Sequence, residues 1–323
     1  MKLYLFYDDG AQAGLGHYRR VSALAHKLAL LSSRTNPIES VLCPIITHKL
    51  DEVENLKAFC AQILSGEALG AVVDSYVFGR EHFALLDSVF ARLVCFDDTN
   101  RAVYPPQSFI LNAAPNAHKL YAARISRHLL GLGFGLSDEA FTPITAVRER
   151  VGDIFVSFGG SDLGNLSAQI LPFIESSVLF APHNPSLDSM PCVIHLVLGR
   201  HYPHTPPTRP YLKHYRDLSP VQMHALMRRC DIAISAGGGT LIELAASLMP
   251  TIMIESAPNQ HFQISQFAAL GAFKHAQSLA QIPTLIQSLL PKFARNQAKT
   301  TLKALRIGLE LESALGNIFG LHS

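Results

Sequence analysis

Short apolar runs alternate along the chain with longer stretches of helical period, and this alternation occurs twice. Because parallel strands need helical crossovers, the pattern is typical of parallel-sheet α/β architecture. In the first half we expect strands at residues 3–7, 40–44, 71–74, 93–96 and 109–111, and helices at 18–31, 51–64 and 81–90. In the second half we expect strands at 154–158, 193–198, 232–235 and 251–254, and helices at 165–178, 220–228, 240–248 and 260–270.

A glycine- and proline-containing stretch at residues 131–152 separates the two series. The chain has 323 residues, more than one hydrophobic core usually organises. We therefore expect two Rossmann-like, doubly wound α/β domains, 1–145 and 146–323, facing a central cleft. Residues 181–191 and 201–210 are dense in proline and polar residues, with histidines among them, and are expected to be exposed loops.

Composition narrows the class of protein. Apolar residues make up 48% of the chain and charged residues 16%, and the formal net charge is only +2 without a long run of like charges. These values predict no nucleic-acid partner and no membrane insertion. The first residues, MKLYLFYDDG, lack the features of a signal peptide, and five widely spaced cysteines fit buried free thiols. We expect a monomer in the cytoplasm.

The first candidate site follows the first expected strand, in the segment DDGAQAGLGHYRR. It places Gly14, Gly16 and His17 at the carboxyl end of a strand, where open α/β sheets bind ligands. Imidazole exchanges protons near neutral pH, so we assign His17 as a general base. A tight turn with a helix-start histidine remains the alternative. Arg20, one helical turn later, pairs with a phosphate or an acidic neighbour, or is a surface arginine.

The second candidate site is ISAGGGTLIELAASLMPTIMI, a strand, a glycine loop, a helix and another strand. Gly237, Gly238, Gly239 and Thr240 would present backbone N–H groups at a helix start, which suits a diphosphate. The same groups would stabilise a leaving diphosphate as its charge develops. Glu243, one turn into the helix, would accept hydrogen bonds from ribose hydroxyls, or fold back as a capping-box residue.

Two further loops belong to the same expected strand edge. APNQH brings Asn259 and Gln260 there, as sugar-recognising amides or as a helix cap with surface polar groups. VSFGGSDLGN places Gly159 and Gly160 after the first strand of the second series. No G-K-[ST] follows either glycine turn and the spacing lacks the dinucleotide fingerprint, which disfavours an ATP-driven motor and a nicotinamide cofactor.

Several polar residues follow strands of the first series and either line the cleft or cap loops: Asp74, Tyr76, Asp97, Asp98 and Asn112. His201 and His204 have an H-x-x-H spacing but no acidic partner nearby. We therefore predict no metal site and no cofactor.

Taken in order, the motifs GLGHYRR, VVDSYVFG, CFDDTN, FVSFGGSD and ISAGGGTLIELA resemble the UDP-2,4-diacetamido-2,4,6-trideoxy-β-L-altropyranose hydrolase family of pseudaminic acid biosynthesis. The resemblance covers both halves of the chain. It extends more loosely to glycosyltransferases of the two-domain B fold.

The resemblance implies metal-free hydrolysis of a UDP-sugar at the anomeric carbon, by water, with inversion and release of UDP. It places the water-activating histidine at His17. It implies sugar or diphosphate contacts at Tyr76, Asn259 and Gln260, ribose contact at Glu243 and diphosphate contact at residues 238–240; we add Gly16 and Arg20 on the sugar side and Gly160 and Gly237 on the UDP side. The free sugar would feed a nonulosonic acid synthase for glycosylation of flagellin or other surface glycans. A B-fold glycosyltransferase, with His17 deprotonating an acceptor hydroxyl, is the alternative, and a noncatalytic nucleotide-sugar binder is a third.

Overall fold

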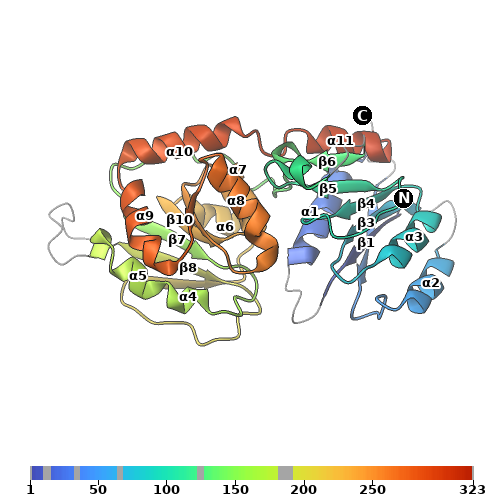
Figure 1. Cartoon of the computed structure of the whole chain (residues 1–323), viewed down its shortest axis with the longest axis horizontal. Helices are drawn as coiled ribbons and strands as arrows, with labels where there is room; N and C mark the ends of the chain where they lie inside the picture. The colour runs from blue at the N-terminus through green and yellow to red at the C-terminus, as the bar shows by residue number, and fades with distance from the viewer. Residues whose placement is uncertain are drawn as a thin grey trace. The chain divides into compact units, whose positions relative to one another are not determined.

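The computed structural model describes residues 2–9, 16–32, 37–63, 68–121, 127–180 and 192–321. Its first sheet has six parallel strands in the order β2-β1-β3-β4-β5-β6 (Figure 1). The strands are β1 (Lys2–Tyr7), β2 (Glu39–Pro44), β3 (Ala68–Asp74), β4 (Leu93–Phe96), β5 (Phe109–Asn112) and β6 (His128–Leu130). The helices of this part are α1 (Gly16–Leu31), α2 (Val53–Ala61), α3 (Arg80–Val89) and α11 (Leu311–Phe319).

The apolar run of β1 is buried on both faces of this sheet, which is why it lacks the polar alternation of a half-exposed strand. Leu3 and Leu5 belong to a core with residues of α1 and α11. Tyr4 and Phe6 belong to a second core that contains residues of α2 and α3. Each fully buried side chain of this kind contributes about 1.5–3 kcal/mol. This burial fixes the strand whose carboxyl end leads to His17.

The second sheet also has six parallel strands, in the order β12-β11-β10-β7-β8-β9. The strands are β7 (Asp153–Ser157), β8 (Val193–Leu198), β9 (Leu212–Arg216), β10 (Ile232–Ala236), β11 (Thr251–Ile254) and β12 (Lys274–Ala276). The helices are α4 (Leu166–Gln169), α5 (Leu171–Glu175), α6 (Pro220–Met227), α7 (Thr240–Ala246), α8 (His261–Ala269), α9 (Ile282–Leu289) and α10 (Lys292–Ala304). Two doubly wound α/β units therefore confirm the predicted fold class.

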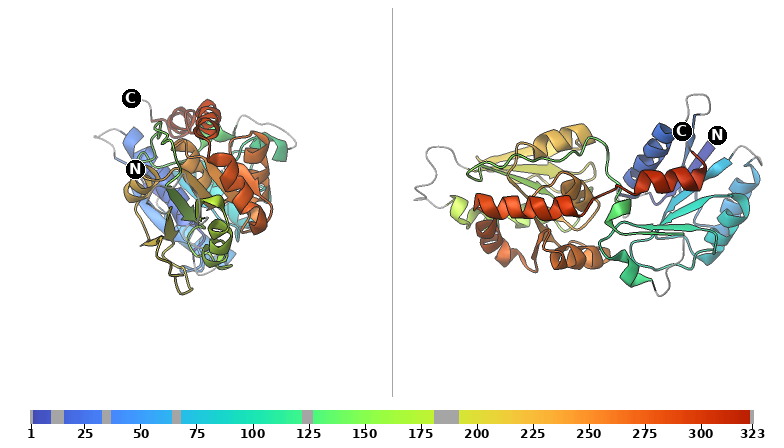
Figure 2. Two further views of the ribbon diagram at one scale, coloured as in Figure 1. Left: turned by 90° about the vertical axis from the view of Figure 1, so that its left-hand side faces the viewer. Right: turned by 90° about the horizontal axis from the view of Figure 1, so that it is seen from above.

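The compact units differ from the expected domains 1–145 and 146–323. One unit comprises residues 1–136 and 308–323, and the other comprises 137–307. Residues before 146 already bond to the second unit, since Ile144 donates its N–H to the Ser247 carbonyl at 3.0 Å. At the other end, α11 returns to the first unit and packs beside α1 (Figure 2). Its Leu311 and Leu315 are fully buried there.

The strong apolar runs were predicted within a few residues, and the differences have local causes. The helix expected at 165–178 is instead two short helices, α4 and α5, because Pro172 at the start of α5 has no N–H to continue the α4 ladder. The short strands β6, β9 and β12 and the helices α9, α10 and α11 were not predicted.

All five cysteines are buried free thiols, as expected. No helix in the described part of the chain is long and apolar enough to cross a bilayer. The expected loop at 181–191 and Gly14 lie outside the described residues. Residues 201–210 contain no helix or strand, but Tyr202 within them is buried and donates its hydroxyl to Asn165 Oδ1 at 2.7 Å.

Candidate functional site

The order of the first sheet reverses direction between β1 and β3, which are hydrogen-bonded neighbours. Such a switch point is where open α/β sheets bind ligands, at the carboxyl ends of the strands. The segment after β1 leads to α1 and His17, and β3 ends at Asp74. Strand order therefore brings together two residues that are 57 positions apart.

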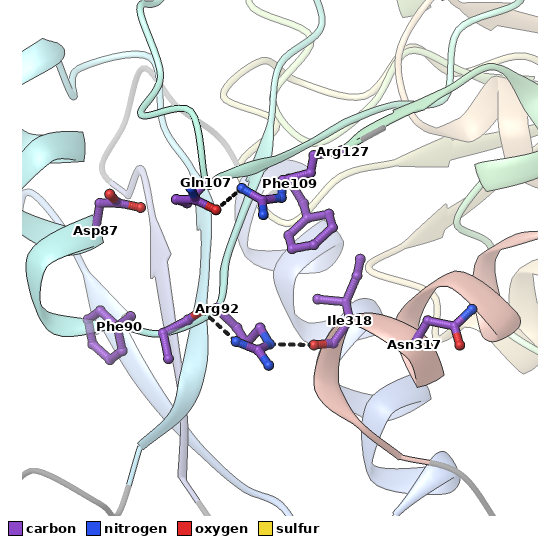
Figure 3. A pocket seen from close by; sticks show the side chains of 9 residues that line it. Asp87, Phe90, Arg92, Gln107, Phe109, Arg127, Asn317 and Ile318 are labelled. Carbon is purple, nitrogen blue, oxygen red and sulfur yellow. Dashed lines mark hydrogen bonds between the residues drawn. The ribbon is translucent and has the colours of Figure 1, made fainter. Parts of the chain in front are cut away.

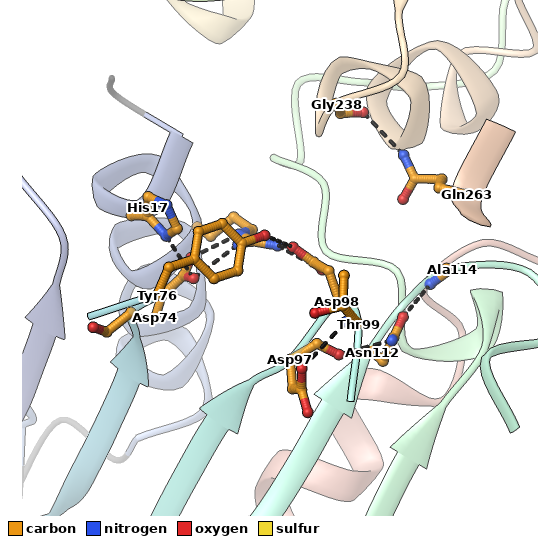
Figure 4. A network of polar contacts seen from close by, with 12 residues as sticks. His17, Asp74, Tyr76, Asp97, Asp98, Thr99, Asn112, Ala114, Gly238 and Gln263 are labelled. Atoms are coloured by element: carbon orange, nitrogen blue, oxygen red, sulfur yellow. Dashed lines mark hydrogen bonds and ion pairs between the residues drawn. The ribbon is translucent and has the colours of Figure 1, made fainter. Parts of the chain in front are cut away.

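His17 and Asp74 form a buried hydrogen bond of 2.7 Å between Nδ1 and Oδ1 (Figure 4). His17 lies in the first turn of α1 and is 6% exposed, and Asp74 is 1% exposed. Because an ionised carboxylate only accepts hydrogen bonds, Nδ1 of His17 carries the proton and Nε2 keeps its lone pair. The pair presents the proton-accepting nitrogen that a general base needs.

Arg20 lies one turn after His17 and contacts two carboxylates at once. Its Nε and Nη2 donate to Asp74 at 2.6 and 2.8 Å, and its Nη1 donates to both oxygens of Asp98 at 2.8 and 2.7 Å. Burial by itself would raise the pKa of Asp74, but the Arg20 guanidinium and the His17 hydrogen bond outweigh it and lower that pKa. Asp74 therefore stays ionised beside the imidazole.

Tyr76 closes the network on the side of β4. Its hydroxyl donates to Asp98 Oδ2 at 2.9 Å, and its ring stands edge-on to the His17 ring, with 5.0 Å between centroids and 89° between planes. Arg101 lies over the Tyr76 ring, with its guanidinium carbon 5.2 Å from the centroid. The sequence-predicted residues His17, Arg20 and Tyr76 are thus in one cluster.

Asp8 and Ser75 hold this cluster in place and were not predicted as site residues. Ser75 donates its hydroxyl to Asp8 Oδ1 at 2.6 Å, and the Tyr76 N–H donates to Asp8 Oδ2. The Ser75 oxygen also accepts the backbone N–H groups of Val77 and Phe78. The sequence signal for Asp8 was its position directly after a buried strand. That position does not distinguish a residue that holds a neighbouring loop from one that binds a ligand.

Asp97 and Asn112 turn out to organise the loops rather than line an opening. Asp97 Oδ1 accepts the backbone N–H of Thr99 at 3.2 Å, and burial raises its pKa. Asn112 donates to the Asp97 carbonyl at 2.7 Å and accepts the Ala114 N–H at 3.0 Å (Figure 4). The capping alternative therefore describes these two residues.

The second sheet reverses direction between β7 and β10, and both glycine turns follow these strands. The three glycines after β10 have different surroundings. A Cβ on Gly237 would lie 2.4 Å from Ile264, whereas a Cβ on Gly238 would only touch Gln260 at 4.0 Å and one on Gly239 would meet no heavy atom within 4 Å. Packing requires a glycine at 237, and open space remains beside 238 and 239, where a ligand can approach the backbone.

Two glutamines brace the same loop. Gln260 Oε1 accepts the N–H groups of Gly237 at 3.1 Å and of Ser256 at 3.0 Å. Gln263 Nε2 donates to the carbonyls of Gly237 and Gly238 at 2.9 and 3.1 Å. Gln260 was predicted as a contact of the diphosphate or the sugar, and its carbonyl oxygen also supports the glycine loop. Gln263 was missed because its place on a helix face gives no sequence signal.

The turn after β7 is shaped by close packing. Gly159 has φ +87°, which favours glycine, and a Cβ on Gly199 would lie 2.0 Å from the Gly160 carbonyl oxygen. The same oxygen accepts the His201 N–H at 3.2 Å. Asp162 caps the next helix, because its carboxylate accepts the N–H groups of Leu166 and Ser167. Gly160 therefore has a packing role whether or not it meets UDP.

Thr240 begins α7, with Gly239 as its N-cap and no side-chain capping bond. Glu243 lies one turn into this helix and is half-buried. Asn259 is exposed, in the single helical turn before α8. Gly16 is the first residue of α1, and a Cβ there would meet no heavy atom within 4 Å in the described part of the chain.

A pocket of about 440 Å³ lies at the opposite edge of the first sheet (Figure 3). It includes Arg92 and Arg127, which directly precede β4 and β6. Arg92 Nε donates to the Ile318 carbonyl at 2.7 Å, and Arg127 Nη1 donates to the Pro106 carbonyl at 3.0 Å. We do not assign the chemistry to this pocket, because His17 and Asp74 are at the carboxyl edge of the sheet.

No cluster of three or more His, Cys, Asp or Glu side chains among the described residues is arranged to hold a metal ion. His204 Nε2 is 3.1 Å from the Leu163 carbonyl oxygen. His201 is exposed.

No protein-family model matches the chain. It is 30% identical over 320 residues to the "Pseudaminic acid cytidylyltransferase and UDP-2,4-diacetamido-2,4,6-trideoxy-beta-L-altropyranose hydrolase" of Helicobacter pylori, a match that covers 98% of this chain and 55% of that protein. The chain thus spans about half the length of this relative. It is also 23% identical over 200 residues to the "UDP-2,4-diacetamido-2,4,6-trideoxy-beta-L-altropyranose hydrolase" of Campylobacter jejuni, which covers 59% of this chain and 73% of that protein.

Solved structures with the same fold include proteins named as glycosyltransferases. The chain superposes on SnogD from Streptomyces nogalater with a TM-score of 0.57 at 15% identity, covering 99% of both chains. It superposes on MurG of Acinetobacter baumannii with a TM-score of 0.60 at 12% identity, again covering 99% of both chains. Such low identities establish the two-domain B-type fold alone. The chain is a homologue, over nearly its whole length, of the Helicobacter pylori protein and, over 59% of its length, of the Campylobacter jejuni protein, both named as UDP-2,4-diacetamido-2,4,6-trideoxy-β-L-altropyranose hydrolases, which confirms the resemblance drawn from its motifs.

Proposed function

We propose that this protein hydrolyses a UDP-linked 2,4-diacetamido-2,4,6-trideoxy sugar, UDP-2,4-diacetamido-2,4,6-trideoxy-β-L-altropyranose, to the free sugar and UDP. The observation that carries the proposal is the buried 2.7 Å bond between His17 Nδ1 and Asp74 at the switch point of the first sheet. Homology to the two named hydrolases supplies the substrate class.

In the proposed reaction His17 Nε2 takes a proton from water while the water oxygen attacks the anomeric carbon. The bond between that carbon and the β-phosphate oxygen breaks, and UDP leaves with the electron pair. Attack opposite the leaving group inverts the anomeric centre. Asp74 stabilises the imidazolium that forms, and the imidazolium then loses its proton to solvent.

We assign UDP to the glycine loop after β10. The open space beside Gly238 and Gly239, at the start of α7, admits a diphosphate close to backbone N–H groups. Glu243 lies one turn further along and is proposed to accept ribose hydroxyls, with Asn259 on the sugar or diphosphate. Tyr76 is proposed to contact the sugar, since its ring flanks the base.

The test is UDP release from the diacetamido altrose nucleotide with no acceptor present, by the wild-type protein and by His17→Ala. We expect steady release by the wild type and a fall of about 10² or more in the variant. Equal UDP affinity of the two proteins, measured by calorimetry, shows that only the chemical step is lost. Tight binding of the nucleotide sugar with no release by the wild type would contradict the hydrolase.

A glycosyltransferase is the second candidate, because solved structures that share this fold include glycosyltransferases. His17 would then deprotonate an acceptor hydroxyl instead of water. Release of UDP only on addition of a sugar or lipid acceptor would favour this function. We also keep as proposals that the protein is a cytoplasmic monomer and that its product feeds a nonulosonic acid synthase for glycosylation of flagellin or other surface glycans.

A further inference from the structure

We propose that Arg20 is a positioning residue that fixes His17 and Tyr76 together, by joining the carboxylate of Asp74 to that of Asp98. This inference rests on the proposed function, because it concerns the same base. Arg20 was predicted on the sugar side of the site, with a phosphate or an acidic neighbour as its partner. The partners in the structure are acidic: the guanidinium makes four hydrogen bonds of 2.6 to 2.8 Å to the two carboxylates.

The geometry needs the planar fork of arginine. One edge of the guanidinium, Nε and Nη2, faces the two oxygens of Asp74, and Nη1 reaches Asp98. The Phe96 ring lies against the group, with the guanidinium carbon 5.2 Å from its centroid. A lysine ammonium is a point charge and cannot hold two carboxylates in this arrangement.

Arg20 acts on the base through Asp74. A single Asp74 oxygen, Oδ1, accepts from both His17 Nδ1 at 2.7 Å and Arg20 Nη2 at 2.8 Å. The second oxygen accepts from Arg20 Nε. Both oxygens of the carboxylate are therefore held by donors, and the hydrogen bond from Nδ1 sets the direction in which His17 Nε2 points. A displacement of the imidazole by a fraction of an ångström weakens a catalytic contact without removing it.

Arg20 acts on Tyr76 through Asp98. Asp98 Oδ2 accepts from Arg20 Nη1 at 2.7 Å and from the Tyr76 hydroxyl at 2.9 Å. Arg20 is thus the centre of a hydrogen-bonded chain that has His17 at one end and Tyr76 at the other. The two ends also contact each other, because the Tyr76 ring flanks His17. Tyr76, which we propose to contact the sugar, and His17, which we propose to activate water, are thereby held in a fixed position relative to each other.

Charge in the cluster also matters for the base. With neutral imidazole, the two carboxylates and Arg20 carry one net negative charge, and the cluster becomes neutral when His17 takes a proton. Two further charged groups contact Tyr76 and have opposite signs: Asp8 accepts its backbone N–H, and Arg101 lies over its ring. Arg20→Gln removes this cation and leaves more negative charge beside the imidazole. The acidic limb of the pH–rate profile should then move to higher pH.

The experiment compares Arg20→Lys and Arg20→Gln with the wild type, using UDP release without acceptor. Arg127→Gln, at the opposite edge of the same sheet, is the matched control and should keep full activity. For Arg20→Lys we expect kcat to fall about 10- to 100-fold. KM and UDP affinity should change less than about threefold, because the proposed UDP loop is untouched. Arg20→Gln should in addition move the acidic limb to higher pH.

The outcomes separate three roles. A rise in KM with unchanged kcat would make Arg20 a substrate contact and overturn the proposal. A fall in melting temperature with unchanged kcat and unchanged pH profile in the folded fraction would make it merely structural, and would overturn it equally. If Arg20→Gln does not fold, Arg20→Lys decides by its kcat and KM.

A measurement without substrate separates this inference from the proposed function. The ¹⁵N chemical shifts of the His17 ring report which nitrogen carries the proton. In the wild type we expect the proton on Nδ1, and in Arg20→Lys a mixture of the two tautomers. Identical ring shifts in both proteins would overturn the inference even if the wild type is a hydrolase. The predicted change would support it even if UDP release fails.

Discussion

Gln260 Oε1 accepts hydrogen bonds from the backbone N–H groups of Gly237 and Ser256, and so joins the glycine loop after β10 to the loop after β11. These strands are neighbours in a parallel sheet, so their carboxyl ends present both loops at one edge. The Ser256 hydroxyl donates to the same oxygen at 3.0 Å. A single side-chain oxygen thus determines the separation of two loops that we assign to UDP.

We expect Gln260→Ala to weaken UDP binding about tenfold or more. Removal of the amide leaves two backbone donors without their partner, at about 1–3 kcal/mol, and about 1.4 kcal/mol corresponds to tenfold in affinity. Titration calorimetry with UDP measures the effect. His261→Ala is the control, since that side chain is 74% exposed and pairs only with Glu255 among the contacts in the described residues. Equal UDP affinity of Gln260→Ala and the wild type would contradict the loop's role.

The glycine loop offers a matched pair of substitutions. Gly237→Ala places a methyl group 2.4 Å from Ile264, so it should lower the melting temperature by several degrees. Gly239→Ala has free space and a helical φ of −56°, so it should fold at least as well as the wild type. We expect it nonetheless to reduce UDP affinity, because its methyl group occupies the space proposed for the diphosphate. Unchanged affinity in Gly239→Ala would place the diphosphate elsewhere.

The sequence predicted the elements whose signal is local. The buried run of residues 3–7 and the strand-loop-helix at 232–246 have apolar patterns that burial on both faces requires. Of the site, His17 and the glycine loop were predicted because glycine has a specific conformational use after a strand. The charged positions after β3 and β4 were recognised as candidates because they directly follow expected strands, where open α/β sheets bind ligands.

The remaining features depend on contacts between distant residues. Nothing near Arg20 in the sequence indicates that it joins Asp74 to Asp98, 54 and 78 positions away. The return of α11 to the first unit was not predicted either, because an amphipathic helix packs on whichever apolar face is free. The three-residue strands β6 and β12 are too short to give a periodic signal.

Lys299 in α10 makes the stability of the second unit depend on pH. Burial, together with Arg295, lowers the pKa of Lys299 from 10.5 to about 8, and its Nζ donates to the Leu248 carbonyl at 3.1 Å. Between pH 8 and 10.5 the unfolded chain binds a proton there that the folded chain does not, so this group makes stability rise with pH. The melting temperature of the wild type should therefore rise relative to that of Lys299→Met over this range.

Lys303→Met is the control for the loss of a lysine from the same helix, because Lys303 is exposed. Its melting temperature should follow the wild type at every pH between 8 and 10.5. A constant difference between the wild type and Lys299→Met across that range would contradict the assignment.

Asp74→Asn tests the carboxylate behind the proposed base while keeping the shape of the side chain. An amide nitrogen facing His17 Nδ1 would donate to it and leave the proton on Nε2, which is the wrong tautomer for accepting a proton from water. Even with the amide oxygen facing the ring, no negative charge remains to stabilise the imidazolium. We expect kcat to fall by about 10²–10⁴ with UDP affinity unchanged, measured by UDP release and calorimetry. Asp87→Asn, at the opposite edge of the sheet, removes the same charge and should keep full activity. A fall of less than about threefold in Asp74→Asn would mean that His17 does not need the Asp74 carboxylate, and would contradict the role that we propose for this pair.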